Sequence, residues 1–77
     1  MTPAQCRMAR SGLSIGVREL AEAAGVSTNT ITRFEKGEIL KPRTINAIKG
    51  ALEAAGVTFT SDKDGDQGVI INIENGL

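Results

Sequence analysis

The 77-residue sequence has no histidine, tryptophan or tyrosine, and it has a single cysteine, Cys6. Without histidine the usual acid–base catalyst is missing, and no nucleophile–base pair stands out, so we do not expect an enzyme. One cysteine forms no internal disulfide and is too little for a zinc site, so we expect no metal and no other cofactor. We expect Cys6 to be a small core residue rather than a redox sensor.

Long hydrophobic runs are also missing. No stretch of about 18 apolar residues is present, which excludes a membrane-spanning helix. The N-terminus lacks the charged segment and apolar core of an export signal. With 40% hydrophobic and 23% charged residues, the composition is that of a globular domain. We therefore expect a small cytoplasmic protein with a modest core, to which a partner surface would add stability.

The net charge of zero conceals an uneven distribution. Residues 1–56 carry eight basic and five acidic side chains, a net +3, whereas residues 57–77 carry one basic and four acidic side chains, a net −3. A basic body with an acidic tail suits a nucleic-acid binder whose tail faces away from the phosphates, although a short chain can also divide this way by chance. The only aromatic residues are Phe34 and Phe59, both expected in the core, which argues against the stacking platforms of proteins that bind single strands or RNA.

Apolar residues recur at spacings of three and four through residues 1–56, which predicts four helices. Thr2 and Ser27 can cap the first and third, and Gly25 and Gly37 can end the second and third. The first predicted helix begins at Pro3 and weakens at Gly12 and Ser14. The second runs from Val17 to Ala24 and the third from Thr28 to about Lys36. After a loop from Glu38 to Arg43, the fourth is capped by Thr44 and stops at Gly56. The residues expected to face inward are Cys6, Ala9, Leu13, Val17, Leu20, Ala21, Ala24, Ile31, Phe34, Ile45, Ile48, Leu52 and Ala55.

Residues 57–73 predict a β-hairpin, because two stretches rich in β-branched residues flank a turn segment. A two-residue turn Asp64-Gly65 would pair Phe59 with Ile70, whereas a three-residue loop ending on a left-handed Gly65 pairs Phe59 with Val69. The second register is favoured, because it gathers one apolar face and burial of one face fixes register. That face holds Val57, Phe59, Val69, Ile71 and Ile73. Since an isolated hairpin is marginal in water, we expect it to pack on the helices, pair with a second subunit, or both.

The second and third predicted helices, joined by a short turn at Gly25, have the helix-turn-helix layout. Residues 4–55 resemble the Cro/C1-type (XRE) family of bacterial and phage regulators. The matching residues are Arg10-x-x-Leu13, Val17-Arg-Glu-Leu-Ala21, Ala24-Gly-Val-Ser-x-x-Thr-Ile-x-x-Phe-Glu-x-Gly37 and Lys41-Pro-Arg43. The resemblance implies a mainly α, four- to five-helix lambda-repressor-like DNA-binding domain over residues 1–56. Residues 57–77 would then be a C-terminal β extension, a hairpin or strand pair.

The resemblance also implies which residues read bases. These are Thr28, Asn29, Thr32 and Arg33 on the third helix. Their chemistry fits, because arginine can bind guanine, asparagine can bind adenine, and threonine can contact the thymine methyl group. The alternative is an ordinary solvated helix face.

A second set of residues is expected near the DNA backbone or the minor groove. It comprises Ser27, Thr30, Lys36, Lys41, Arg43 and Arg18. Some relatives insert an arginine at the position of Arg43 into a narrow minor groove. Lys36 could instead compensate the helix dipole. The chain departs from the family at Gly16 and Val17, where a polar cap and a glutamine are usual; this removes one backbone anchor, for which Arg18 could substitute.

Two further expectations concern structure and assembly. Arg10 and Glu35 occupy positions that form a partly buried ion pair in some relatives, so we expect a structural pair. The hairpin residues Val57, Phe59, Val69, Ile71 and Ile73 are candidates for dimerisation.

The leading hypothesis is a homodimeric regulator, a repressor or dual activator and repressor, that binds an inverted repeat in double-stranded DNA. The alternative is an interaction protein, such as an antitoxin or an antagonist of another regulator, whose acidic tail binds a protein partner.

Overall fold

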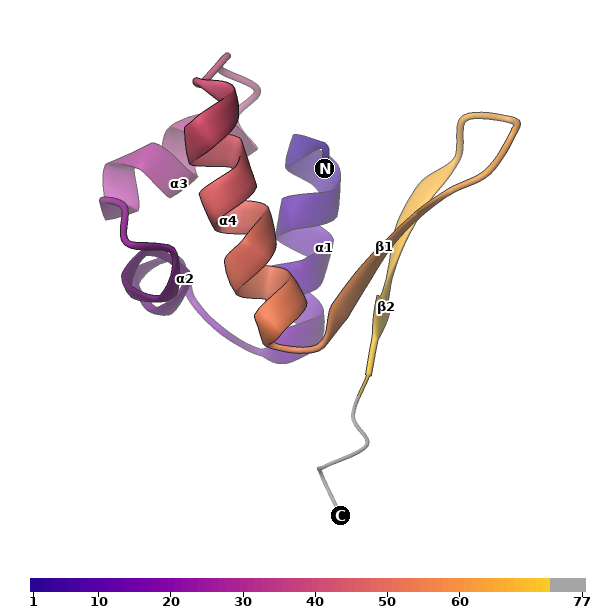
Figure 1. The fold of residues 1–77 in the computed structure, drawn as a ribbon, viewed down its shortest axis with the longest axis horizontal. Helices are drawn as coiled ribbons and strands as arrows, with labels where there is room; N and C mark the ends of the chain where they lie inside the picture. The colour runs from indigo at the N-terminus through magenta and orange to yellow at the C-terminus, as the bar shows by residue number, and fades with distance from the viewer. Residues whose placement is uncertain (73–77) are drawn as a thin grey trace.

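Four helices and one β-hairpin make up residues 1–72, the part of the chain that the computed structural model describes (Figure 1). The elements are α1 (Pro3–Leu13), α2 (Val17–Ala24), α3 (Thr28–Glu35), α4 (Pro42–Ala54), β1 (Val57–Ser61) and β2 (Gln67–Ile71). The predicted mainly α domain with a C-terminal hairpin is confirmed. No helix within residues 1–72 is long and apolar enough to cross a membrane. Ile73, one of the predicted dimerisation residues, lies outside the described residues.

The turn between α2 and α3 is built as the sequence predicts. Gly25 has a φ of 72°, and the main-chain N–H of Val26 donates to the carbonyl of Ala21 at 3.0 Å. This Schellman motif closes α2 and redirects the chain within two residues. The same left-handed conformation ends α1, but there the residue is Ser14, with a φ of 58°.

The start of α4 differs from the prediction. The helix begins at Pro42 with Lys41 as its cap residue, and the N–H of Thr44 donates to the carbonyl of Lys41 at 3.0 Å within the first turn. Thr44 is therefore not the cap. Proline is favoured at the first helical position, because its fixed φ suits a helix and its missing N–H would have no partner there. The helix ends at Ala54, and Ala55, expected to face inward, is exposed.

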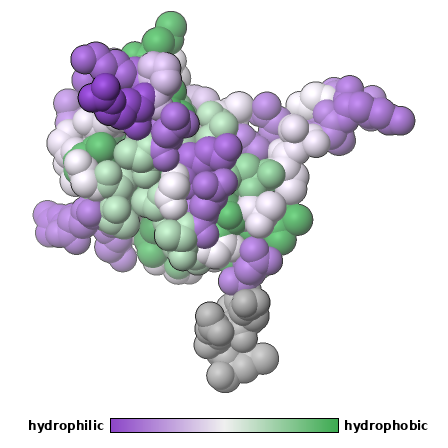
Figure 2. All heavy atoms as spheres, viewed as in Figure 1, coloured by the Kyte–Doolittle hydropathy of each residue, from purple (hydrophilic) through white to green (hydrophobic). Residues whose placement is uncertain are grey.

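The hydrophobic core joins all four helices and the first strand. Its buried residues are Cys6, Ala9, Leu20, Ala21, Ile31, Phe34, Ile48, Leu52 and Val57. Because Val57 belongs to this core, the hairpin is continuous with the helical body at its base. In Figure 2 apolar residues gather near that base, and hydrophilic residues cover the outer end of the hairpin.

The favoured hairpin register is confirmed. Phe59 pairs with Val69, the loop closes with the N–H of Asp62 donating to the carbonyl of Asp66 at 2.9 Å, and Gly65 has a φ of 88°. The sheet packs on α1 and α4, on the side away from α2 and α3 (Figure 1).

Gly12 permits the hairpin to lie close to α1. A Cβ atom at this position would stand 2.8 Å from Cγ1 of Ile71, well inside van der Waals contact. Although glycine is a poor helix former, α1 continues through Gly12 to Leu13, and the missing side chain lets β2 approach the helix backbone.

Gln5 ties the hairpin to α1. Its side chain is only 4% exposed, and its Nε2 donates to the carbonyls of Thr60 at 2.9 Å and Gly68 at 3.0 Å, one on each strand. Its Oε1 accepts from the N–H of Thr2 at 2.9 Å, which completes a capping box at the start of α1. The capping contact joins residues three positions apart, whereas the two hairpin contacts join residues 55 and 63 positions apart.

Candidate nucleic-acid interface

Helix α3 has one buried face and one exposed face. Ile31 and Phe34 belong to the core, whereas Thr28, Asn29 and Arg33 are exposed. The short turn after α2 and the packing of α2 on α3 hold this helix at the surface of the domain. Three of the four predicted base-reading residues are thus available to a partner.

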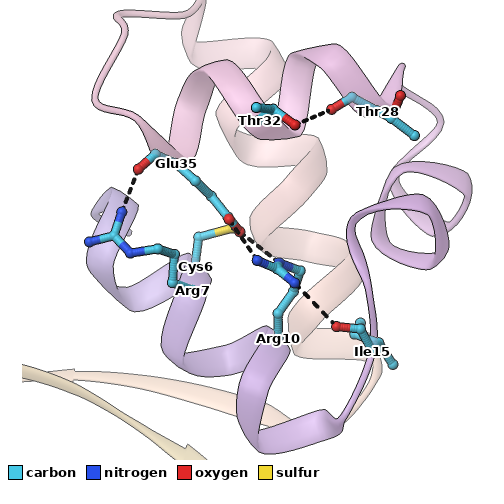
Figure 3. Close-up of polar contacts among 7 residues, drawn as sticks. All are labelled: Cys6, Arg7, Arg10, Ile15, Thr28, Thr32 and Glu35. Carbon is cyan, nitrogen blue, oxygen red and sulfur yellow. Dashed lines mark hydrogen bonds and ion pairs between the residues drawn. The ribbon is translucent and has the colours of Figure 1, made fainter.

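Hydroxyl groups at the start of α3 already have partners within the chain. Oγ of Ser27 accepts from the N–H of Thr30 at 3.1 Å and lies 2.8 Å from the hydroxyl of Thr30. The half-buried Thr32 donates from Oγ1 to the carbonyl of Thr28 at 3.1 Å (Figure 3). Because the hydroxyl proton is engaged, Thr32 can offer a base its methyl group and, as an acceptor only, its hydroxyl oxygen.

Arg33 forms an ion pair that the sequence did not indicate. Its Nε lies 2.9 Å from Oε1 of Glu38, and the two side chains are 47% and 50% exposed. Glu38 had no predicted role. The signal was local: Gly37 ends α3, and a Schellman motif at such a glycine places the next residue beside the residue five positions earlier.

The predicted backbone-contacting cations are all exposed. Lys36 is the cap residue at the end of α3, Lys41 precedes α4, Arg43 is in its first turn, and Arg18 is in the first turn of α2. A groove between the start of α3 and the loop before α4 brings part of both predicted sets together. Its lining includes Ser27, Thr30, Arg33, Leu40, Lys41, Thr44 and Ile39, whose side chain is 95% exposed.

An ion pair joins α1 to the end of α3 (Figure 3). Nε of Arg10 donates to Oε2 of Glu35 and Nη2 to Oε1, each at 2.8 Å. The thiol of Cys6 donates to Oε2 at 3.2 Å, and Nη1 of Arg7 donates to the main-chain carbonyl of Glu35. Two arginines and the thiol of α1 therefore fix the last turn of α3.

Glu35 remains ionised in this setting. Burial by itself would raise the pKa of its carboxyl group, but hydrogen bonds from Arg10 and Cys6 and the charges of Arg10 and Arg7 outweigh it, so the pKa lies below its usual value. The hydrogen bond to Glu35 in turn raises the pKa of Arg10.

Cys6 is held as a neutral thiol. Burial, with the hydrogen bond and negative charge of Glu35, raises its pKa to about 12. Because the thiolate is the reactive form, this environment makes Cys6 a poor redox centre and a suitable core residue.

The start of α2 lacks a side-chain cap at Gly16, as the sequence indicated. Oε1 of Glu19 instead accepts the N–H of Gly16 at 2.9 Å, a role that the sequence did not mark. Val17 is half-buried, and the exposed Arg18 is the cation nearest to this missing anchor in the sequence.

The predicted dimerisation residues within residues 57–72 have inward side chains and outward main-chain groups. Val57 is buried, and Phe59, Val69 and Ile71 are half-buried against the helices. The N–H of Asn72 donates to the carbonyl of Gly56, and the N–H of Asp62 donates to the carbonyl of Asp66. The hydrogen-bonded pairs between β1 and β2 are therefore those of even-numbered residues. Because bonded and non-bonded pairs alternate, the N–H and C=O groups of the odd-numbered residues point to the sheet edges.

Within the described part of the chain, no three histidine, cysteine, aspartate or glutamate side chains gather where they could hold a metal ion. A family model described as helix-turn-helix matches residues 4–58, more than two thirds of the chain. No curated protein matches the chain.

Proposed function

Because the chain belongs to the Cro/C1-type helix-turn-helix (XRE) family of DNA-binding transcription regulators, we propose that it regulates transcription as a homodimer bound to an inverted-repeat operator. The observation that carries this proposal is the exposed polar face of α3. Thr28, Asn29 and Arg33 face outward, while Ile31 and Phe34 anchor the opposite face in the core. Such a helix presents its polar side chains to the major groove while the core fixes its orientation.

The exposed side chains suit direct base recognition. Asn29 can accept from and donate to adenine, and Arg33 can donate to guanine O6 and N7. Thr28, and Thr32 through its methyl group, can contact thymine. Lys36 at the end of α3, and Lys41 and Arg43 at the start of α4, are exposed and would neutralise phosphates, which fixes the position of the protein on the duplex without reading its sequence.

The homodimer is supported by two features. A single reading helix makes too few contacts for selective binding in a genome, whereas two helices about 34 Å apart read both halves of an inverted repeat. The hairpin lies on the side of the domain away from α2 and α3, and the main-chain N–H and C=O groups of Phe59, Val69 and Ile71 point to its edges with no hydrogen bond to the described residues. Strand edges readily pair with another chain, so two hairpins could join across the two-fold axis.

The decisive experiment is selection of bound sequences from a random duplex library, with the mass of the complex measured by sedimentation. We expect an inverted repeat whose half-site centres are about one helical turn apart, bound by two chains. A selected site without symmetry, bound by one chain, would contradict the homodimer. Failure to enrich any sequence would contradict specific DNA binding altogether.

Asn29→Ala tests base recognition with a matched control. We expect it to weaken operator binding by about 1–3 kcal/mol and to relax one base position. Asn46→Ala removes the same side chain from an exposed site on α4 and should leave base preference unchanged. If Asn29→Ala weakens operator and random duplex equally, Asn29 is only a backbone contact.

Two proline variants test the hairpin edges. Ser61 and Gln67 have exposed side chains and outward N–H groups, one on each edge, so proline removes an edge donor with little change in packing. We expect Ser61→Pro or Gln67→Pro to shift the chain toward monomer in sedimentation while its helical circular dichroism remains. Two variants that both stay dimeric would place the dimer interface elsewhere.

A second candidate function is an interaction protein, such as an antitoxin. One observation favours it: the outer end of the hairpin, which carries exposed Asp62, Asp64 and Asp66, lies beyond the helical body (Figure 1). Under this alternative, a small protein from the native source would co-purify with the wild-type chain and be lost with Asp64→Lys. Operator binding that is unchanged or stronger in Asp64→Lys, with no such protein, favours the regulator.

A further inference from the structure

The ion pair between Arg33 and Glu38 lies at the exposed end of α3. It uses only one guanidinium nitrogen, Nε, which lies 2.9 Å from Oε1 of Glu38. No hydrogen bond within the described residues involves Nη1 or Nη2 of Arg33. The pair therefore engages the guanidinium from its side and leaves its far end open.

The backbone sets this pairing. Gly37 has a φ of 97°, the N–H of Glu38 donates to the carbonyl of Arg33 at 3.1 Å, and that of Gly37 donates to Phe34 at 2.9 Å. These are the two bonds of a Schellman motif, in which the residue after the glycine lies over the residue five positions earlier. An apolar contact is common at that place; here a carboxylate and a guanidinium occupy it.

We propose that Glu38 is a positioning residue that holds Arg33 through Nε so that its two terminal nitrogens read a guanine. This rests on the proposed function. Guanine presents O6 and N7 side by side in the major groove, and the paired N–H groups at the end of a guanidinium match them. A carboxylate on Nε removes rotamer freedom from Arg33 and disfavours its use on a phosphate, because the anion repels phosphates.

A carboxylate beside DNA has an opposing effect on affinity. Its charge weakens binding to every duplex, specific or random, through repulsion of the phosphates. A positioning role therefore predicts that removal of Glu38 raises affinity for random duplex yet lowers discrimination between bases. A carboxylate that only competes with DNA for Arg33 predicts higher affinity with discrimination unchanged or increased.

The test compares Glu38→Ala, Glu38→Gln and Arg33→Ala on the selected operator, on operators with adenine in place of each half-site guanine, and on random duplex. For Glu38→Ala we expect tighter binding to random duplex and about a tenfold loss of discrimination at one guanine. Glu38→Gln removes the same charge but keeps an acceptor oxygen, so it should bind random duplex like Glu38→Ala and retain part of the discrimination. Glu53→Ala makes the same charge change at an exposed site on α4 and should leave discrimination intact.

The outcomes separate the two proposals. Arg33→Ala should abolish discrimination at the same guanine. Discrimination lost in Arg33→Ala but intact in Glu38→Ala overturns the positioning role and leaves the base-reading role of Arg33 standing. Discrimination intact in Arg33→Ala overturns that base-reading role itself. Equal discrimination in Glu38→Ala and Glu38→Gln, both lower than in the wild type, shows that charge rather than the acceptor oxygen fixes the arginine.

Discussion

Replacement of Gln5 should loosen the hairpin from the helices. Gln5→Met keeps a similar shape but removes the bonds to Thr60 and Gly68, at 2.9 and 3.0 Å, and the bond to the N–H of Thr2. Both strand carbonyls belong to a ladder pair and the N–H of Thr2 is only part-buried, so no group is left deeply buried without a partner. At about 1 kcal/mol for each strand bond, we expect a loss of about 2 kcal/mol in unfolding free energy.

Gln5→Glu separates the contact that caps α1 from the two contacts that hold the hairpin. A glutamate keeps the oxygen that accepts from Thr2 but places a second oxygen against the carbonyls of Thr60 and Gly68. At neutral pH this buried charge should cost more than Gln5→Met, about 3 kcal/mol. The carboxyl pKa would be raised in the folded state, so the cost is absent below the unfolded value of about 4 and grows as the pH rises above it.

Thermal unfolding and amide hydrogen exchange measure the effect. A loss of 2 kcal/mol in a domain of this size lowers the midpoint by about 8–16 °C. Exchange should accelerate more at the ladder amides of Thr58 and Ile70 than at amides of α2 and α3, because Gln5 restrains the hairpin specifically. A midpoint within about 2 °C of the wild type, with unchanged hairpin exchange, would refute the reasoning.

Three further predictions concern the ion pair, the thiol and the end of α1. Glu35→Gln should lose about 2–3 kcal/mol at neutral pH, because Arg10 keeps its charge without its partner. Since the pKa of Glu35 is lowered on folding, the wild type should lose this stability as pH falls through the folded pKa, whereas denaturant titrations of Glu35→Gln should lack that acid-dependent step. Folding raises the pKa of the Cys6 thiol from 9.0 to about 12, so the free energy of unfolding should fall by about 1.4 kcal/mol per pH unit as the pH rises through that range. Cys6→Ala should remove this pH dependence. The same pH dependence in Cys6→Ala would contradict a raised pKa of Cys6. Ser14→Gly should stabilise the fold by about 0.5–1 kcal/mol and so raise the unfolding midpoint, because glycine adopts the left-handed conformation without a Cβ clash. A lower midpoint would show that Ser14 is not strained.

Local rules predicted most of the helical frame. The bounds of α2 were predicted at Val17 and Ala24, and α3 begins at Thr28 after its cap Ser27, because spacing and capping act between near neighbours. The prediction for α4 was wrong at its start. Two local signals competed there, a proline suited to the first helical position and a threonine suited to a cap, and the proline prevailed.

The candidate site was only partly open to prediction. The outward face of α3 follows from the buried Ile31 and Phe34, since the helical period then fixes which side chains point away. The proximity of Glu38 to Arg33 was also predictable, because a Schellman motif at Gly37 places these two residues side by side. Which guanidinium nitrogen the carboxylate engages could not be predicted, because that depends on the three-dimensional arrangement of the two side chains.

The sequence by itself determined that four helices form, the turn at Gly25, the hairpin register and the polar face of α3, because each depends on residues that are close together in the chain. Only the tertiary structure decided where the hairpin rests. Gln5 bonds to Gly68, 63 positions away, and Gly12 makes room for Ile71. Such contacts leave no periodicity or local spacing in the sequence, because they form only when the hairpin packs on α1 and α4. Through them, Gln5, which also caps α1, and Gly12 hold the hairpin against the helices.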